Sequence, residues 1–325
     1  MKKYYINLQM FADGDNNDIP IRRYEKQMAG ILPAVYGATA HFRDFFAGDL
    51  EALDGISDSD TAFSVKTSDV ASAFVSGSLA SGGTRAYDTG ANVAFGSGTG
   101  SSSRFGARTE VIYKNIDVPY TWDWTFHEGL DRHTVNADFD AAIADRLELN
   151  ARAQINAFNA HHSAFISAHA TENVASTGVD PAAQGATADG IKAEAIKIFN
   201  ALSKYFVNIG AIGTKVAKVC PDLWNAIVDN GLTTTSKGSS VDIDENEVKM
   251  FKGFVLEQIP DAEFQTDEIC YAYVQGIGKA FTGISTARTV ASEDFDGVAL
   301  QGAGKAGEWV SNDNAKAIAK VTVGV

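Results

Sequence analysis

Residues 138–170 read DFDAAIADRLELNARAQINAFNAHHSAFISAHA and carry a continuous helical pattern. Apolar and ring-bearing side chains recur there at spacings of three and four, the period of one face of an α-helix. The members of this stripe are Phe139, Ile143, Leu147, Ala151, Ile155, Phe158, His162, Phe165 and His169. Asp138 is a favourable N-cap. The pattern predicts a helix of about 50 Å at 1.5 Å per residue, longer than a compact domain of this size needs.

Two predicted strands precede this helix, and a long segment rich in glycine and serine separates them. Apolar and polar residues alternate between Thr61 and Val75 and again from Thr109 to Phe126, which is the period of a half-buried strand. Residues 76–106 hold too few bulky side chains to build a core. Loops of that length in compact domains are usually functional or disordered. We therefore expect an extended hairpin whose tip projects away from the body of the protein.

The rest of the chain mixes helix and strand signals, which indicates an α+β fold in two packed sub-domains. A leader of ~20 residues outside the core is expected at the N-terminus, because its acidic run has little to bury. The other expected elements are a short helix within residues 22–46, a linker over 171–189, a helix over 191–206, a strand over 215–219, a helix opening at Pro221, and strands over 254–259, near 270–274 and over 318–323.

Composition and charge exclude several classes of protein. With 45% apolar and 21% charged residues, the chain is neither wholly disordered nor a fibrous repeat. No apolar run approaches the ~20 residues that span a bilayer, so we expect no membrane segment. The formal net charge of −14 repels phosphates and argues against specific DNA binding. Cys220 and Cys270 lack Cys or His neighbours at metal-ligand spacing, so we expect two small buried residues.

Motifs that suggest catalysis fail on their spacing or context. His127, Glu128 and His133 resemble a zinc-peptidase motif, but the two histidines are six residues apart rather than four, so we expect a polar turn there. The run GSGTG at residues 96–100 precedes a predicted strand, whereas a phosphate-binding loop must open a helix. No serine lies in the context of a nucleophile elbow. We therefore expect no catalytic residue, no metal and no cofactor.

Trp122 and Trp124 lie two residues apart in the second predicted strand, so their side chains share one face. Core packing and a contact between subunits both remain open for this aromatic pair. His161, His162 and His169 on the predicted helix lack a carboxylate set on one face, and we expect packing or interface roles for them.

Several stretches carry a resemblance to a known family. They are residues 7–12 (NLQMFA), 118–131 (VPYTWDWTFHEGLD), 251–260 (FKGFVLEQIP), 278–281 and 294–307. In these stretches, and in the order of its elements, the chain resembles the major capsid proteins of tailed phages of Gram-positive bacteria, which have the HK97-like fold. The resemblance implies an N-terminal arm, an extended E-loop hairpin, a P-domain with a long spine helix, and an A-domain.

Carried onto this chain, the resemblance implies a set of boundaries. They are the arm at residues 1–50, a connection to the P-domain at 51–61, the E-loop at 62–118, the P-domain with its spine at 119–185, the A-domain at 186–285 and the return strands of the P-domain at 286–325. It also implies hexamers and pentamers of this chain that tile an icosahedral head around double-stranded DNA, and a portal protein. Because only a short leader precedes the body, it implies a separate scaffolding protein or none, and we expect a separate one. Assembly is expected in the host cytoplasm.

The E-loop is expected to lie over a neighbouring subunit. The hypothesis pairs loop residues with acids of the predicted helix, and the contact residues are Tyr87, Phe95, Arg104, Phe105, Arg108, Asp140, Asp145 and Glu148. No Lys, Asn and Glu align with the crosslinking trio of some relatives, so we make no prediction about crosslinking. Two other classes stay open, namely a different virion protein, such as a tail-tube or decoration subunit, and an enzyme with an unrecognised site.

Overall fold

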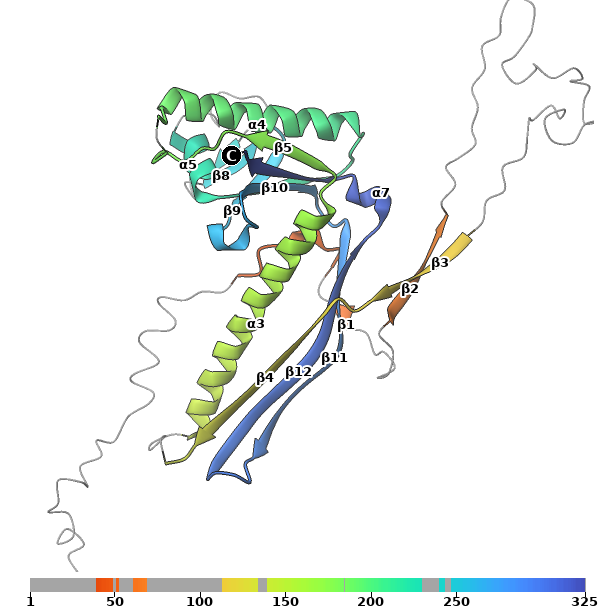
Figure 1. Cartoon of the computed structure of the whole chain (residues 1–325), viewed down its shortest axis with the longest axis vertical. Helices are drawn as coiled ribbons and strands as arrows, with labels where there is room; N and C mark the ends of the chain where they lie inside the picture. Colours follow the sequence, from red (N-terminus) through yellow and green to blue (C-terminus); the bar gives the residue numbers. More distant parts are fainter. Residues whose placement is uncertain are drawn as a thin grey trace, which may run out of the picture. The chain divides into compact units, whose positions relative to one another are not determined.

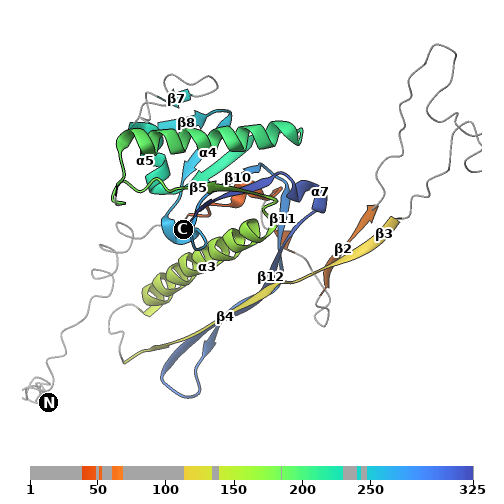
Figure 2. The ribbon, with the colours of Figure 1, turned by 45° about the horizontal axis from the view of Figure 1, so that its top comes forward.

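The computed structural model describes residues 39–48, 51–52, 61–68, 113–133, 139–183, 185–229, 240–242 and 247–324. Contacts between Cα atoms divide the chain into two units, one made of residues 1–57 and 120–325 and the other of residues 58–119. Figures 1 and 2 show the elements of the first unit, which consists of two β-sheets and the helices that cover them. None of the described helices is long and apolar enough to cross a membrane.

The larger sheet of the first unit has seven strands and a helical cover on one face. Its order is β5 (Glu172–Ser176), β13 (Ile318–Val323), β10 (Glu268–Val274), β6 (Lys215–Val219), β9 (Phe254–Gln258), β8 (Glu247–Phe251) and β7 (Ser240–Asp242). Helices α4 (Ala188–Asn208) and α5 (Pro221–Asp229) pack on it through one core cluster, in which Leu202 and Leu223 are fully buried. Figure 1 shows α4 lying across this sheet.

The opposite face of the same sheet builds a second core cluster with residues that lie far away in the sequence. Alternate residues of one strand point to opposite faces, so Ala217 packs in the first cluster and Val216 in the second. The second cluster also holds Phe42 and Phe45 from the segment 39–48, which contains the 3₁₀ turn η2 (Arg43–Phe45), and Ile166 from a long helix. This face therefore joins the N-terminal part of the chain to the sheet.

The smaller sheet of the first unit has four strands in the order β1 (Glu51–Ala52), β11 (Gly278–Ala291), β12 (Gly297–Val310) and β4 (Trp122–Asp131). Helix α3 (Phe139–His169) runs along it, as Figures 1 and 2 show. Its contacts include Ala142 packed against Leu130 and Leu300. At 31 residues, α3 is about 46 Å long. The predicted long helix is confirmed.

Glycines of β12 let the aromatic residues of β4 lie flat on the sheet. Gly302 pairs with Phe126 and Gly304 with Trp124. A Cβ atom at Gly302 would lie 2.1 Å from the Phe126 ring, and one at Gly304 would lie 2.6 Å from the Trp124 ring. Both distances are impossible for real side chains, so the rings occupy the space that side chains of β12 would need. These glycines are required for close packing rather than for backbone freedom.

The second unit contains the antiparallel pair β2 (Thr61–Ser68) and β3 (Tyr113–Pro119). Val118 is buried, whereas Tyr113 is 72% exposed and Ile116 is 47% exposed. Two strands alone are marginally stable in water. The hairpin therefore presents large apolar side chains that a further contact would stabilise.

Several predicted elements are confirmed, and three expectations are wrong. The strands at 215–219 and 318–323 and the helix opening at Pro221 have the predicted starts, and the helix over 191–206 lies within α4. The single strand predicted from 109 to 126 is instead two strands, because the chain changes sheet at Tyr120 and Thr121, where the Thr121 N–H donates to the Ala306 carbonyl at 3.0 Å.

The polar turn expected over His127, Glu128 and His133 is wrong for the first two residues, because β4 continues through both to Asp131 along its partner β12. His133 lies in the turn that follows β4. The linker expected at 171–189 contains β5, which pairs with β13. The local sequence pattern did not predict the long strands β11 and β12, and only the resemblance implied return strands, within 286–325. Of the short helix expected within 22–46, the described part, residues 39–46, shows the turn η2 alone. Short elements complete the fold, namely η4 (Asp261–Glu263) and α7 (Asn312–Ala315).

Candidate functional site

The contact residues predicted from the sequence fall into two groups. Five of them, Tyr87, Phe95, Arg104, Phe105 and Arg108, lie outside the described residues. The three acids lie in the first third of α3. Asp140 and Glu148 are exposed and Asp145 is partly exposed, and Glu148 forms an ion pair with Arg152 one turn later. The acids are therefore accessible, and the hypothesis that arginines pair with them stays a prediction.

Burial along α3 is uneven, and this leaves part of the predicted stripe uncovered. The buried residues of α3 are Ala142, Asn159, His162, Ser163 and Ile166. Four of these five lie between residues 159 and 166, whereas Leu147 of the stripe is 41% exposed and Ala151 is also exposed. The helix is thus anchored mainly through its C-terminal half. Its middle part offers surface that other residues can cover.

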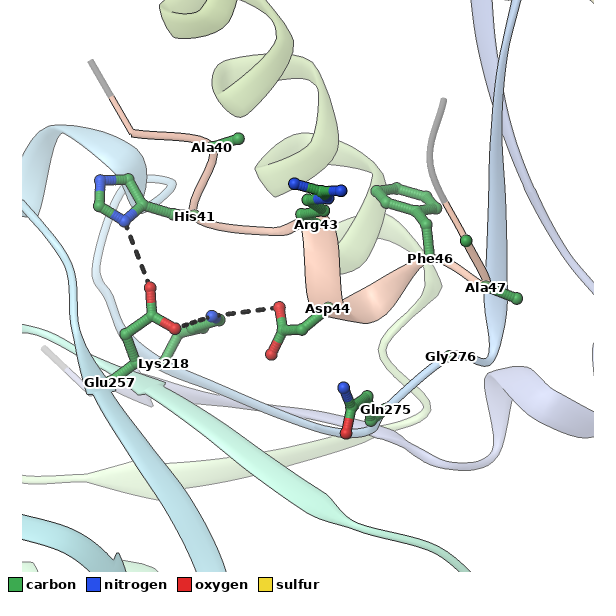
Figure 3. Close-up of a pocket in the computed structure, with 11 residues that line it drawn as sticks. Ala40, His41, Arg43, Asp44, Phe46, Ala47, Lys218, Glu257, Gln275 and Gly276 are labelled. Carbon is green, nitrogen blue, oxygen red and sulfur yellow. Dashed lines mark hydrogen bonds and ion pairs between the residues drawn. The ribbon is translucent and has the colours of Figure 1, made fainter. Parts of the chain in front are cut away.

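A buried lysine fastens the segment 39–48 to the seven-stranded sheet. Lys218 of β6 is 1% exposed, and its Nζ lies 3.1 Å from the Asp44 carboxylate and in contact with the Glu257 carboxylate. Glu257 also lies 3.4 Å from His41 Nδ1, and the Tyr273 hydroxyl donates to Asp44 at 2.8 Å. Figure 3 shows this chain of charges across an open cavity of about 560 Å³. The charge of Lys218 is neutralised from both sides, as a buried charge requires.

Aromatic packing holds the same segment. Phe45 is fully buried, and its ring centroid lies 5.0 Å from those of Phe46 and Tyr273 in edge-on geometry. A Cβ atom at Gly278 would lie 2.4 Å from the Phe45 ring, so only glycine fits at the start of β11. Fully buried rings of this size contribute strongly to stability. The segment 39–48 is therefore an anchor, a name used below for these residues.

A second buried polar junction lies where α3, β4 and β12 meet. Glu308 of β12, 5% exposed, lies 2.9 Å from His162 Nδ1 and accepts hydrogen bonds from Trp122 Nε1 and Thr121 Oγ1, both at 3.1 Å. Burial alone would raise the pKa of Glu308, but these hydrogen bonds and the nearby His162 lower it overall. The ring of Phe46 from the anchor packs on His162 at 4.5 Å between centroids. Glu308 therefore ties the start of β4 to the helix.

The motifs considered for catalysis find structural partners instead. Glu128 bonds Arg146 of α3, and His127 lies 3.2 Å from Gln301. Among the residues that the structure describes, no three His, Cys, Asp or Glu side chains converge as a metal site. Cys220 and Cys270 are buried as expected, and burial raises the pKa of both thiols, that of Cys220 to about 11. These thiols are protonated at neutral pH and poorly nucleophilic.

The tryptophan pair lies on one face of β4, as expected. Trp122 stacks on His161 of α3 with 4.0 Å between ring centroids and lies 4.7 Å from Phe158. Trp124 stacks on Phe126 within the strand. Core packing between β4 and α3 thus accounts for Trp122. For Trp124, core packing and a contact between subunits both stay open.

Sequence reasoning missed the anchor and the Glu308 junction. Their residues lie far apart in the chain, so no local spacing reveals the contacts. One signal was available, because Lys218 interrupts the otherwise apolar run VAKVC at 216–220 on a strand expected to be buried. A lysine buried there requires an acidic partner.

Comparison with solved structures finds similarity in fold over most of the chain. The mature capsid of bacteriophage PhiM1 is 12% identical with a TM-score of 0.59, over 89% of this chain and 87% of the other. The capsid of cyanophage P-SCSP1u is 11% identical with a TM-score of 0.60, over 91% of each chain. Mycobacterium phage Che8 gives 14% identity and a TM-score of 0.56, over 88% of this chain and 92% of the other. No protein-family model and no curated protein matches the sequence.

Proposed function

We propose that this chain, which has the HK97-like fold of tailed-phage major capsid proteins, is the structural subunit of a phage head. In this proposal, copies of the chain assemble through hexamers and pentamers into an icosahedral shell that encloses double-stranded DNA. The observation that carries the proposal is the likeness in fold to phage capsid structures over about nine-tenths of the chain. The protein acts by self-association and is not an enzyme.

The charge of the chain suits a DNA container. A net charge of −14 repels the packaged phosphates, so an inner wall made of this protein would resist neither the loading nor the release of the genome. Binding of DNA would then be unspecific and weak. The further partners in this proposal are a portal protein and a separate scaffolding protein, and the place of the protein is the virion after assembly in the host cytoplasm.

The hairpin of the second unit supplies the contact that the proposal needs. Its strand β3 exposes Tyr113 and Ile116. Residues 69–112, which lie between β2 and β3 in the sequence, include the segment rich in glycine and serine. We assign this hairpin to the E-loop, lying over a neighbouring subunit with Arg104 and Arg108 near Asp140 and Asp145. Contacts of this kind need bury only a modest area each, because every subunit meets several neighbours.

Two experiments test this contact. Deletion of residues 81–102 should prevent normal closed shells in electron micrographs, and normal shells would refute the role of the loop. The double variant Arg104→Glu and Arg108→Glu should also impair assembly, and the added change of Asp140 and Asp145 to Arg should restore it. Lys204→Glu, an exposed charge reversal on α4, serves as the matched control and should assemble.

The alternative is another virion structural protein, such as a tail-tube or decoration subunit. Negative-stain images separate the two, because a tail-tube subunit forms rings or tubes and a decoration subunit stays small. The sub-domain boundaries given above remain predictions within the capsid proposal.

A further inference from the structure

An apolar groove lies between the anchor and the middle of α3. Its walls are residues 40–48 on one side and α3 from Ala151 to His162 on the other, with Ala280 at its end. The cavity volume is about 500 Å³, which is the size of a pocket that takes several side chains. Ile155 and Phe158 are only half-buried in it, and Ala151 is exposed. Apolar surface of this kind favours a partner.

The chain itself is tethered beside this groove. Asn159 of α3, which lines the groove, donates from its Nδ2 to the Thr39 carbonyl at 2.7 Å and accepts from the His41 N–H at 3.2 Å. The backbone of the anchor is thus pinned to α3 at one end of the groove. The residues that precede Thr39 are therefore attached to the body at this end of the groove.

The residues that precede Thr39 match the groove in chemistry and in reach. Met28, Ile31, Leu32, Val35 and Tyr36 are the apolar residues of that stretch at helical spacing. From Asn159 to Ala151 the groove spans eight helical residues, about 12 Å. That distance equals about four residues of extended chain or about eight of helix. Counted back from Thr39, four extended residues end at Val35 and eight helical residues end at Ile31.

We propose that residues 31–36 dock in the groove between the anchor and α3 of the same chain. A tether of four to eight residues gives an effective concentration in the millimolar range, well above that of a second copy in a dilute solution of subunits. Docking buries Val35 and Tyr36 against Ile155 and Phe158, so an unassembled subunit hides apolar surface that would otherwise promote aggregation. This docking is independent of the capsid function, because it concerns the single chain.

Disulfide trapping tests the docking in the unassembled full chain. The pair Val35→Cys and Ala151→Cys places one thiol on the docking segment and one in the groove. The matched control pairs Val35→Cys with Ala153→Cys, which lies about 200° further round α3 and is also an exposed alanine. Oxidised glutathione is the oxidant. Cys220 and Cys270 stay in place, because both are buried.

We expect the groove pair to form a disulfide within one chain at least tenfold faster than the control pair. A mixture of tagged and untagged chains distinguishes links within a chain from links between chains by mass. Equal rates for the two pairs would overturn the proposal. Links mainly between chains would overturn it as well, since the groove would then take a second copy.

Discussion

Replacement of Lys218 by Met tests whether the charge cluster holds the anchor to the sheet. Methionine keeps most of the volume of the lysine but leaves Asp44 and Glu257 facing each other without a cation. Removal of one partner of a buried ion pair costs 3–5 kcal/mol. The two carboxylates here are 23% and 43% exposed and can regain water. We therefore expect a smaller cost of about 2–3 kcal/mol, just below that range.

The assay is hydrogen exchange at Ala47, whose N–H donates to the Gly278 carbonyl at 2.8 Å. When exchange reports the opening equilibrium of the anchor, a loss of about 2–3 kcal/mol increases the exchange rate about 30- to 150-fold. The control Lys204→Met changes an exposed lysine and should leave the rate within about twofold. The triple change of Lys218 to Met, Asp44 to Asn and Glu257 to Gln should recover most of the loss, because it removes the unpaired charges. An unchanged rate at Ala47 in Lys218→Met would refute the reasoning.

Three further variants probe the rest of the first unit. Glu308→Gln removes a carboxylate whose pKa in the folded protein lies below its ordinary value of 4.5. This carboxylate stabilises the folded protein by about 1–3 kcal/mol above pH 4.5, and the stabilisation is lost as the pH falls through the lowered pKa. The difference in melting temperature between variant and wild type should thus be full at pH 7 and shrink as the pH falls below 4.5, and a constant difference would contradict this. Gly304→Val places side-chain atoms where the Trp124 ring lies and should cost about 1–3 kcal/mol or more in urea unfolding, whereas Ala303→Val, at an exposed position of the same strand, should cost much less. Thr187→Ala removes the N-cap of α4, where the Gly190 N–H donates to Oγ1 at 3.2 Å, and should cost about 1 kcal/mol in the same assay.

The α+β fold and its long helix could be predicted because their signals are local. Helix α3 has a continuous stripe at a period near 3.6, and β6 and β13 are short apolar runs bounded by polar residues or turns. The HK97-like fold expected from the resemblance is confirmed by the solved structures. For α3, β6 and β13, the elements predicted from local periodicity therefore agree with the fold implied by the resemblance.

The longest strands could not be predicted from the local sequence pattern, because their stability comes from distant partners. β12 reads GVALQGAGKAGEWV, a run with many small residues that lacks the usual β-branched and aromatic enrichment of strands. Its glycines are explained only by the rings of β4 that pack against them, and these rings lie more than 170 positions earlier in the chain. The same contact extends β4 through His127 and Glu128, where a turn was expected. Tertiary pairing overrode the local pattern in both places.

The candidate site was predictable only in part. The accessible acids of α3 follow from the helical pattern, since Asp140 and Glu148 lie off the apolar stripe. The anchor depends on contacts between residues near 44, 218 and 257. Lys218 within an apolar run signals that an acidic partner exists, but no sequence spacing identifies that partner.

Self-assembly of the full-length chain tests the central claim most directly. The chain is expressed alone and together with a scaffolding protein, and the products are measured by mass photometry and electron microscopy. We expect closed icosahedral particles built of hexamers and pentamers in at least one of the two conditions. Rings, tubes or monomers alone in both conditions would contradict the claim that this chain builds a shell.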